Sequence, residues 1–87
     1  MAVVFIPVLM QDLTAGTTQV RVAGKTLRDL ITNLEARFPG MQARLLQDGD
    51  LRPDLAIAID GEVSLEGLAE RVSEQSEVHF IPPISGG

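Results

Sequence analysis

The sequence predicts a single α+β domain, a mixed sheet of four to five strands with one main helix packed across it. Strand-like runs of alternating apolar residues lie near both ends of the chain, and one amphipathic helical pattern lies between them. The chain has 87 residues, of which 45% are hydrophobic. This is enough for one core, but it leaves little room for an enclosed substrate pocket. The composition therefore disfavours a self-contained enzyme.

The first two strands are expected to form a hairpin. Residues 3–9 are rich in β-branched side chains and predict a strand. Pro7 cannot donate a ladder hydrogen bond, so it is expected at a strand end or a bulge. Turn residues follow over positions 12–18, and residues 19–22 then alternate polar and apolar as a half-buried strand does.

The main helix is expected over residues 26–38. Thr26 is a typical N-cap, and Asp29 stands three residues later in a variant of the capping box. The pair Pro39 and Gly40 predicts the end of the helix. The apolar side chains that follow the helical period and would form its buried face are Leu27, Leu30, Ile31, Leu34 and Phe38.

Shorter elements are expected after the helix. Residues 41–47 predict a short helical turn with Leu45 and Leu46 directed inward. The acidic segment 48–50 is interpreted as a solvated loop, because it lacks the ligand spacing of a calcium-binding loop.

The second half of the chain supplies the remaining strands. Residues 55–60 alternate strictly, and Asp60 followed by Gly61 predicts a tight turn. Residues 65–72 carry three spaced apolar side chains and predict a short helical turn or an irregular crossing. Residues 77–81 predict the last strand. We expect one folded domain over residues 1–81.

One face of this sheet is expected to be a flat docking surface. Ala56 and Ala58 are small and share the face opposite to Leu55, Ile57 and Ile59. Outward Phe5, Leu65 and Ile81 would add an apolar patch for a protein partner. The alternative is an ordinary scatter of surface hydrophobic residues.

Residues 82–87 are expected to form a flexible tail that follows the last strand. Pro82 and Pro83 favour an extended path, so the six residues reach about 20 Å. Ser85 and Gly86 would thread a partner's active-site channel, because small residues permit a close approach. Gly87 would present its carboxylate at the tip. The alternative is that the terminal glycines are a frayed end without a role.

Composition and charge exclude several kinds of site and partner. The absence of cysteine excludes disulfides, thiolate metal sites and a cysteine nucleophile. The single histidine, His79, is interpreted as a strand surface residue rather than a metal ligand or catalytic base. No apolar run approaches the ~20 residues of a membrane span, so a cytoplasmic protein without a membrane partner is expected.

The charge is uneven along the chain. Residues 1–47 carry five basic and three acidic side chains, whereas residues 48–87 carry two basic and nine acidic ones. The acidic half would repel nucleic acid. Two interpretations of it remain open, namely steering of a basic protein partner and ordinary solubility.

The ending EVHFIPPISGG of residues 77–87, together with the predicted strand order, resembles the ubiquitin-like β-grasp sulfur carriers of the MoaD/ThiS superfamily. The segments FIPVL at 5–9 and GKTL at 24–27 look most similar to carriers of the cysteine-biosynthesis type. The FIPP segment at 80–83 looks similar to the small subunit of molybdopterin synthase.

The resemblance implies a protein co-substrate rather than an enzyme, although a molybdopterin synthase partner would make it that enzyme's small subunit. A ubiquitin-activator-type adenylating enzyme would use ATP and Mg²⁺ to adenylate Gly87, and no cofactor or metal would be bound stably by the chain itself. A thiocarboxylate at Gly87 would then supply sulfur to a biosynthetic enzyme for cofactor or cysteine synthesis. Phe5, Leu65 and Ile81 would be approximate docking positions.

Two alternatives to the sulfur carrier remain. The first is a ubiquitin-like modifier that is joined through the same terminus to lysines of target proteins. The second is a structural interaction module whose tail has no chemical role.

Overall fold

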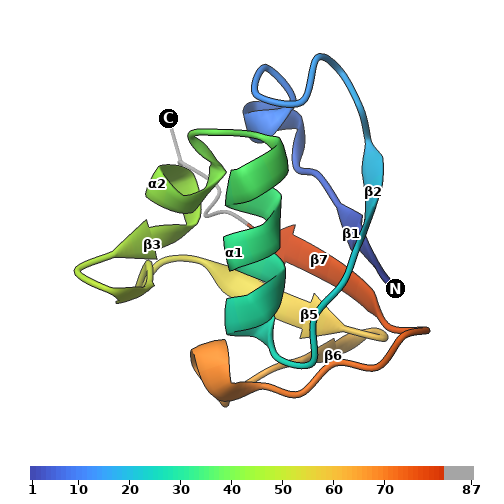
Figure 1. Ribbon diagram of the computed structural model, residues 1–87. Coiled ribbons are helices and arrows are strands. Elements are labelled where there is room, and N and C mark those ends of the chain that lie inside the picture. The colour runs from blue at the N-terminus through green and yellow to red at the C-terminus, as the bar shows by residue number, and fades with distance from the viewer. Residues whose placement is uncertain (82–87) are drawn as a thin grey trace.

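The computed structural model describes residues 1–81, and the expected tail of residues 82–87 lies outside the described residues. Within the described part, five strands form one mixed sheet in the spatial order β2-β1-β7-β5-β6 (Figure 1). The predicted α+β class is confirmed. The strands of this sheet are β1 (Ala2–Phe5), β2 (Gln19–Val22), β5 (Ala56–Ile59), β6 (Glu62–Val63) and β7 (Glu77–Ile81).

The pairing places the first and last strands side by side at the centre of the sheet. β1 runs antiparallel to β2 and parallel to β7, and β5 runs antiparallel to both β7 and β6. The expected opening hairpin is therefore present, and β7 is flanked on both sides. β5 turns into β6 through Asp60 and Gly61, which have φ values of 53° and 86°. This is the tight turn that the sequence predicts.

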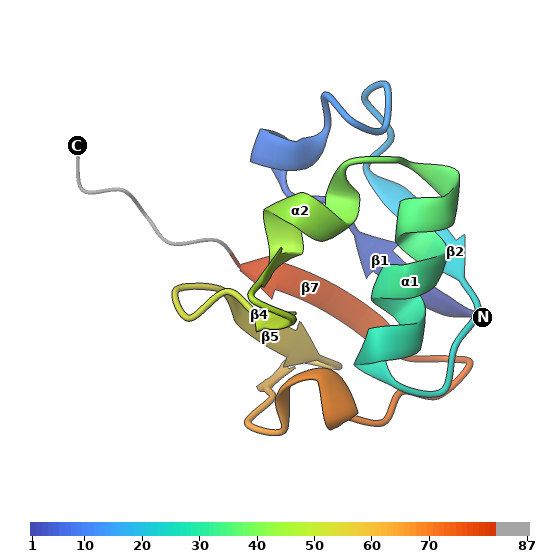
Figure 2. The same cartoon turned by 60° about the vertical axis from the view of Figure 1, so that its left-hand side comes forward.

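The helix α1 (Leu27–Arg37) crosses one face of the sheet (Figure 2). Its N-terminus is capped as expected, because the Thr26 hydroxyl accepts a hydrogen bond of 3.2 Å from the Asp29 amide. The Asp29 carboxylate in turn accepts from the Lys25 amide at 3.1 Å. In a standard capping box the carboxylate would accept from the amide of the N-cap itself, whereas here it accepts from the residue before the N-cap. This carboxylate bond also fixes the loop that leads from β2 into the helix.

The core lies between α1 and the sheet. The helix contributes Leu27, Leu30, Ile31 and Leu34, all of which are buried. The residues from the sheet and from the shorter elements that complete the buried apolar cluster are Ala2, Val4, Ile6, Met10, Val20, Val22, Met41, Leu45, Ile57, Leu68, Val78 and Phe80. The alternation in β1, β2 and β7 explains this set, because every second residue faces the helix.

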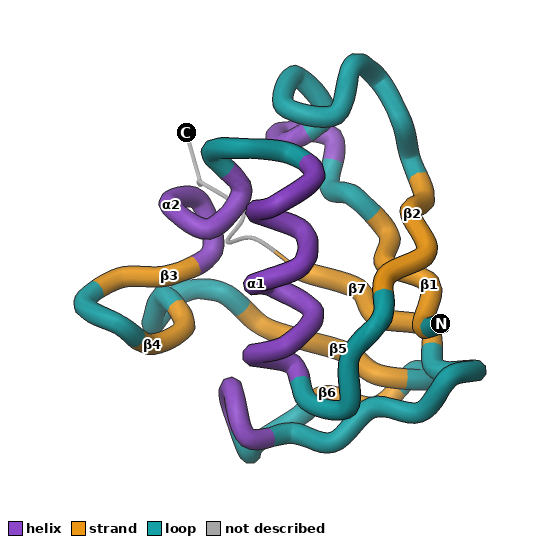
Figure 3. Tube along the Cα trace, viewed as in Figure 1, coloured by secondary structure: helices purple, strands orange, loops and turns teal. Residues whose placement is uncertain are grey.

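Shorter elements close the ends of the core (Figure 3). They are the 3-10 helix η1 (Val8–Met10), the helix α2 (Met41–Leu45), the ribbon of β3 (Leu46–Gln47) with β4 (Asp50–Leu51), and the 3-10 helix η2 (Gly67–Ala69).

The predicted first strand was wrong in its second half. β1 ends at Phe5, and residues 8–10 turn back as η1 instead of continuing the sheet. Pro7 is the cause, because it lacks the N–H that a further ladder step requires. The Met10 amide instead donates to the Pro7 carbonyl at 2.8 Å and closes the 3-10 turn.

The segment after α1 also differs from its prediction. The expected helical turn over 41–47 ends at Leu45, and Leu46 is half-buried in β3. The expected loop 48–50 is a hairpin turn in which Asp48 and Gly49 have positive φ, and Asp50 already belongs to β4. Strands of two residues are too short to show a period in the sequence.

Candidate functional site

The face of the sheet opposite α1 carries a row of apolar and aromatic residues. Strand register brings Phe5 of β1 level with His79 of β7, and His79 level with Ala58 of β5. Ile81 pairs with Ala56 in the neighbouring row. We call this surface the open face and define it as Phe5, Ala56, Ala58, His79 and Ile81.

A stacked ring pair lies at the centre of the open face. The rings of Phe5 and His79 are parallel within 7°, with their centroids 4.1 Å apart. Both side chains are half-buried. His79 therefore packs as an aromatic surface residue of the strand. Among residues 1–81 there is no group of three or more His, Cys, Asp or Glu side chains placed to hold a metal ion.

The structure separates the three docking residues that the sequence singled out. Phe5 and Ile81 lie on the open face, and Ile81 is 46% exposed. Leu65 is 92% exposed, but it lies between β6 and η2, where it lines a shallow hollow with Arg28 of α1 and Asp50 of β4. The open face thus unites two of the three.

Sequence reasoning missed four exposed apolar residues, namely Met1, Val63 and the neighbours Val8 and Leu9. Val8 and Leu9 in η1 are 80% and 70% exposed. The predicted strand over 3–9 had assigned them to the sheet. The signal that identifies them is Pro7, which forms the N-cap of η1 with φ of −60° and ψ of 148°.

β7 carries the chain out of the sheet. It ends at Ile81, between β1 and β5, at the same end of the sheet at which β1 leads into η1. Figure 2 shows this end, with η1 beyond the tip of β1 and the tip of β7 nearby. The predicted reactive and threading residues Gly87, Gly86 and Ser85 follow in sequence and lie outside the described residues.

A hollow of about 680 Å³ lies over the N-terminal turn of α1 and is lined by residues that include Lys25, Arg28 and Asp29. The Asp29 carboxylate there is already bonded to the Lys25 amide. No helix within residues 1–81 has the length and apolar character needed to cross a membrane.

Comparison with known proteins identifies the relatives of this chain. A model of the ThiS family matches residues 6–87. Small archaeal modifier protein 3 of Haloferax volcanii is 33% identical over 64 residues, which are 71% of this chain and 70% of that protein. The sulfur carrier protein CysO of Mycobacterium tuberculosis is 32% identical over 89 residues, covering 97% of this chain and 96% of that protein.

Solved structures agree with the sequence relatives. A chain of the Amycolatopsis orientalis BexX/CysO complex superposes with a TM-score of 0.95 at 26% identity, over 100% of both chains. CysO of M. tuberculosis gives a TM-score of 0.89 at 28% identity, over 97% of this chain and 100% of that one. The fold is therefore the ubiquitin-like β-grasp. Since the family model spans almost the whole sequence, the chain belongs to the ThiS family.

Proposed function

We propose that the protein is a sulfur carrier that transports sulfur as a thiocarboxylate on Gly87. One observation carries the proposal, namely that the ThiS family model extends over residues 6–87 and so includes the segment that follows the central strand β7. The relative CysO is named as a sulfur carrier protein and covers 97% of this chain. The absence of cysteine fits the proposal, because sulfur held as a thiocarboxylate needs no thiol of the chain.

The proposed chemistry has two steps, both on a partner enzyme. The Gly87 carboxylate attacks the α-phosphate of Mg²⁺-bound ATP, which gives an acyl-adenylate and releases pyrophosphate. A sulfide equivalent then attacks the acyl carbon and expels AMP, which leaves the thiocarboxylate and releases a proton. A carboxylate is a poor electrophile until it gains such a leaving group. The partner enzyme supplies the metal and the stabilising charges, and the carrier supplies the acyl group.

The open face is the proposed docking surface for these partners. Its residues combine two small side chains, Ala56 and Ala58, with the larger Phe5 and Ile81 beside the chain exit. A flat apolar surface suits a protein partner better than a small ligand. The structural relative from A. orientalis belongs to a complex with a second protein, BexX. We assign the partners here to an adenylating enzyme of the ubiquitin-activator type and to a biosynthetic enzyme that receives the sulfur.

In this proposal the chain is a co-substrate in the cytoplasm, where ATP is available, and not an enzyme in its own right. The relative CysO, which is named a sulfur carrier protein and covers 97% of this chain, supports this assignment.

The proposal is tested by incubating the untagged protein with the adenylating enzyme of its genome, ATP, Mg²⁺ and sulfide. Intact-mass spectrometry should show an increase equal to the difference between sulfur and oxygen, and fragmentation should locate it at Gly87. Deletion of Gly87 should abolish the gain. A control reaction with a known carrier should first show, by the release of AMP, that the enzyme is active. If the mass of the wild-type protein then stays unchanged, the proposal is refuted.

A second candidate function is a ubiquitin-like protein modifier. It is favoured by the 33% identity to small archaeal modifier protein 3. The same acyl-adenylate would then react with a lysine amine of a target protein and form an isopeptide. Because no lysine or arginine follows Arg71 in the sequence, trypsin would leave residues 72–87 on the target lysine. A search of cell digests must use that remnant, since a search for Gly-Gly alone would miss every conjugate.

A further inference from the structure

The turn η1 presents two neighbouring apolar side chains to solvent. Val8 is 80% and Leu9 is 70% exposed, whereas Met10 beside them is buried in the core. Isolated exposed apolar residues are ordinary. Two in succession on one short turn, with the next residue anchored in the core, form a raised apolar contact point.

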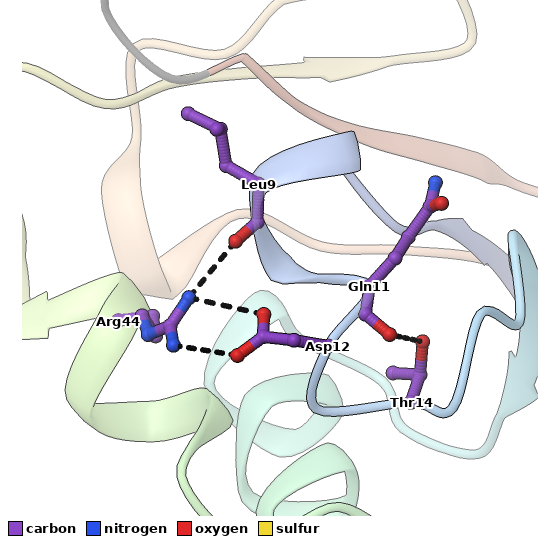
Figure 4. A network of polar contacts seen from close by, with 5 residues as sticks. All are labelled: Leu9, Gln11, Asp12, Thr14 and Arg44. Atoms are coloured by element: carbon purple, nitrogen blue, oxygen red, sulfur yellow. Dashed lines mark hydrogen bonds and ion pairs between the residues drawn. The ribbon is translucent and has the colours of Figure 1, made fainter.

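Hydrogen bonds hold this turn in place (Figure 4). Arg44 of α2 donates to the Leu9 carbonyl at 2.9 Å and to the Asp12 carboxylate at 3.0 Å. On the other side, Gln11 donates from its side chain to the Ile6 carbonyl at 3.0 Å. Figure 4 shows the Leu9 carbonyl facing Arg44 while the Leu9 side chain points away from it.

The Arg44 bonds serve position more than stability. The side chains of Arg44 and Asp12 are 43% and 61% exposed, and an ion pair as exposed as this adds at most about 1 kcal/mol. What the bonds do provide is a fixed backbone position for Leu9. A contact that is ordered before binding loses less entropy when it forms.

The turn lies beside the place where the chain leaves the sheet. Phe5, the last residue of β1, is level with His79 of β7, and Pro7 and Ile81 each follow two residues later, Pro7 still with extended backbone. Adjacent strands are about 4.8 Å apart and each residue adds about 3.3 Å, which puts Val8 and Leu9 within roughly 12 Å of Ile81.

We propose that Val8 and Leu9 form a second recognition point that contacts an apolar rim around the active-site channel of the adenylating enzyme. The inference rests on the proposed function and extends it from the open face to η1. The open face and η1 would then both contact the enzyme near Ile81, where the chain leaves the sheet.

The short segment after Ile81 indicates that the adenylating enzyme is the partner that contacts this surface. Gly87 is the sixth residue after Ile81, and six residues span at most about 20 Å. An enzyme that brings Gly87 to ATP must therefore cover the surface around Ile81. A standard interface of about 800 Å² per partner has a radius of about 16 Å, and centred on Ile81 it includes η1.

The test compares Leu9→Asp with Gln75→Asp in the assay of thiocarboxylate formation. Both variants place one new negative charge on an exposed site, but Gln75 lies in the turn before β7, at the opposite end of the sheet. Leu9→Asp should raise the KM for the carrier about tenfold or more, because the charge loses water against an apolar rim. Its kcat should stay within about twofold, since Gly87 is unchanged. Gln75→Asp should leave both values at those of the wild type.

Further variants separate the outcomes. Val8→Asp should repeat the effect of Leu9→Asp, and Arg44→Ala should raise the KM by about threefold by releasing the turn. Thermal unfolding should remain cooperative for Leu9→Asp and Val8→Asp, which shows that both variants are folded. If the wild type forms the thiocarboxylate and the KM values of Leu9→Asp, Val8→Asp and Gln75→Asp are equal, this inference is wrong. The proposed function would not be affected by that result. A wild-type protein that gains no sulfur would refute the proposed function and this inference together.

Discussion

Gly24 is the residue at which a single methyl group should do most harm to the backbone. It connects β2 to α1 with φ of 154°, and an added Cβ would lie 2.8 Å from the Asp29 Cβ and 2.9 Å from the Leu30 Cδ2. Leu30 is fully buried, so it has little freedom to move away. The close packing of this loop against the first turn of α1 therefore depends on glycine.

Gly24→Ala is expected to lower the free energy of unfolding by about 2–4 kcal/mol through overpacking and backbone strain. Gly16→Ala is the matched control, because Gly16 also has positive φ, at 85°, but has no atom within 4 Å of its Cβ position. It should lose only about 1 kcal/mol from backbone strain. Urea unfolding monitored by circular dichroism measures both. Equal losses would mean that the contacts with Asp29 and Leu30 are unimportant.

At the scale of elements, α1 protects the edge of the sheet. β2 is an edge strand, and edge carbonyls are open to pairing with other chains. Two side chains of α1 occupy this edge, since Arg37 donates to the Arg21 carbonyl and Asn33 to the Ala23 carbonyl, both at 2.6 Å. The helix thus buries its apolar face and caps the neighbouring strand with polar ones.

The double variant Asn33→Ala with Arg37→Ala should therefore have two effects. It should lower the free energy of unfolding by about 1–2 kcal/mol, and it should increase self-association at high concentration because the carbonyls become available. Arg28→Ala is the control on the same helix, since the Arg28 side chain is exposed and donates no hydrogen bond within the part of the chain that the structure describes. Urea unfolding and sedimentation velocity measure the two effects. A double variant with the same association state as the wild type would show that the edge is protected by other means.

The elements also show where sequence reasoning succeeds. α1 was predicted within one residue at each end, because Thr26, Asp29 and Pro39 are local signals that act on neighbouring backbone groups. β7 was predicted at its observed bounds, because its alternation is unbroken. The end of β1 was not, since the apolar run continues past Pro7 and only the missing N–H stops the ladder.

The candidate site was predictable only in part for a related reason. Alternation within a strand places Phe5 and Ile81 on a face, and the structure puts them on the same one. The distance of Leu65 from them depends on the path between β6 and η2, which no period encodes. The exposure of Val8 and Leu9 depends on the turn at Pro7 and on Arg44, a residue far along the sequence.

At the scale of the whole molecule, four acidic residues are separated from the chain exit. Asp60, Glu62, Glu74 and Glu77 lie near the end of the sheet at which β7 begins, whereas Ile81 lies at the other end. Along β7 alone, the four steps from Glu77 to Ile81 span about 13 Å, which exceeds the Debye length of about 8 Å at physiological salt. If the partners dock around Ile81, this acidic end points away from them. The structure thereby favours solubility over steering as the role of these acids.

The double variant Glu62→Gln with Glu74→Gln decides between these two roles. It removes two exposed negative charges from the remote end, so the KM for thiocarboxylate formation should stay within about twofold of the wild type at 0.15 M salt. Asp54→Lys is the matched contrast, because Asp54 is exposed and lies just before β5, whose first residue pairs with Ile81. A charge reversal there should change the KM by about fivefold or more, and the change should shrink as salt is added. A tenfold rise in KM for the double variant at 0.15 M salt would mean that a basic partner binds the acidic end. The docking orientation around Ile81 would then be wrong.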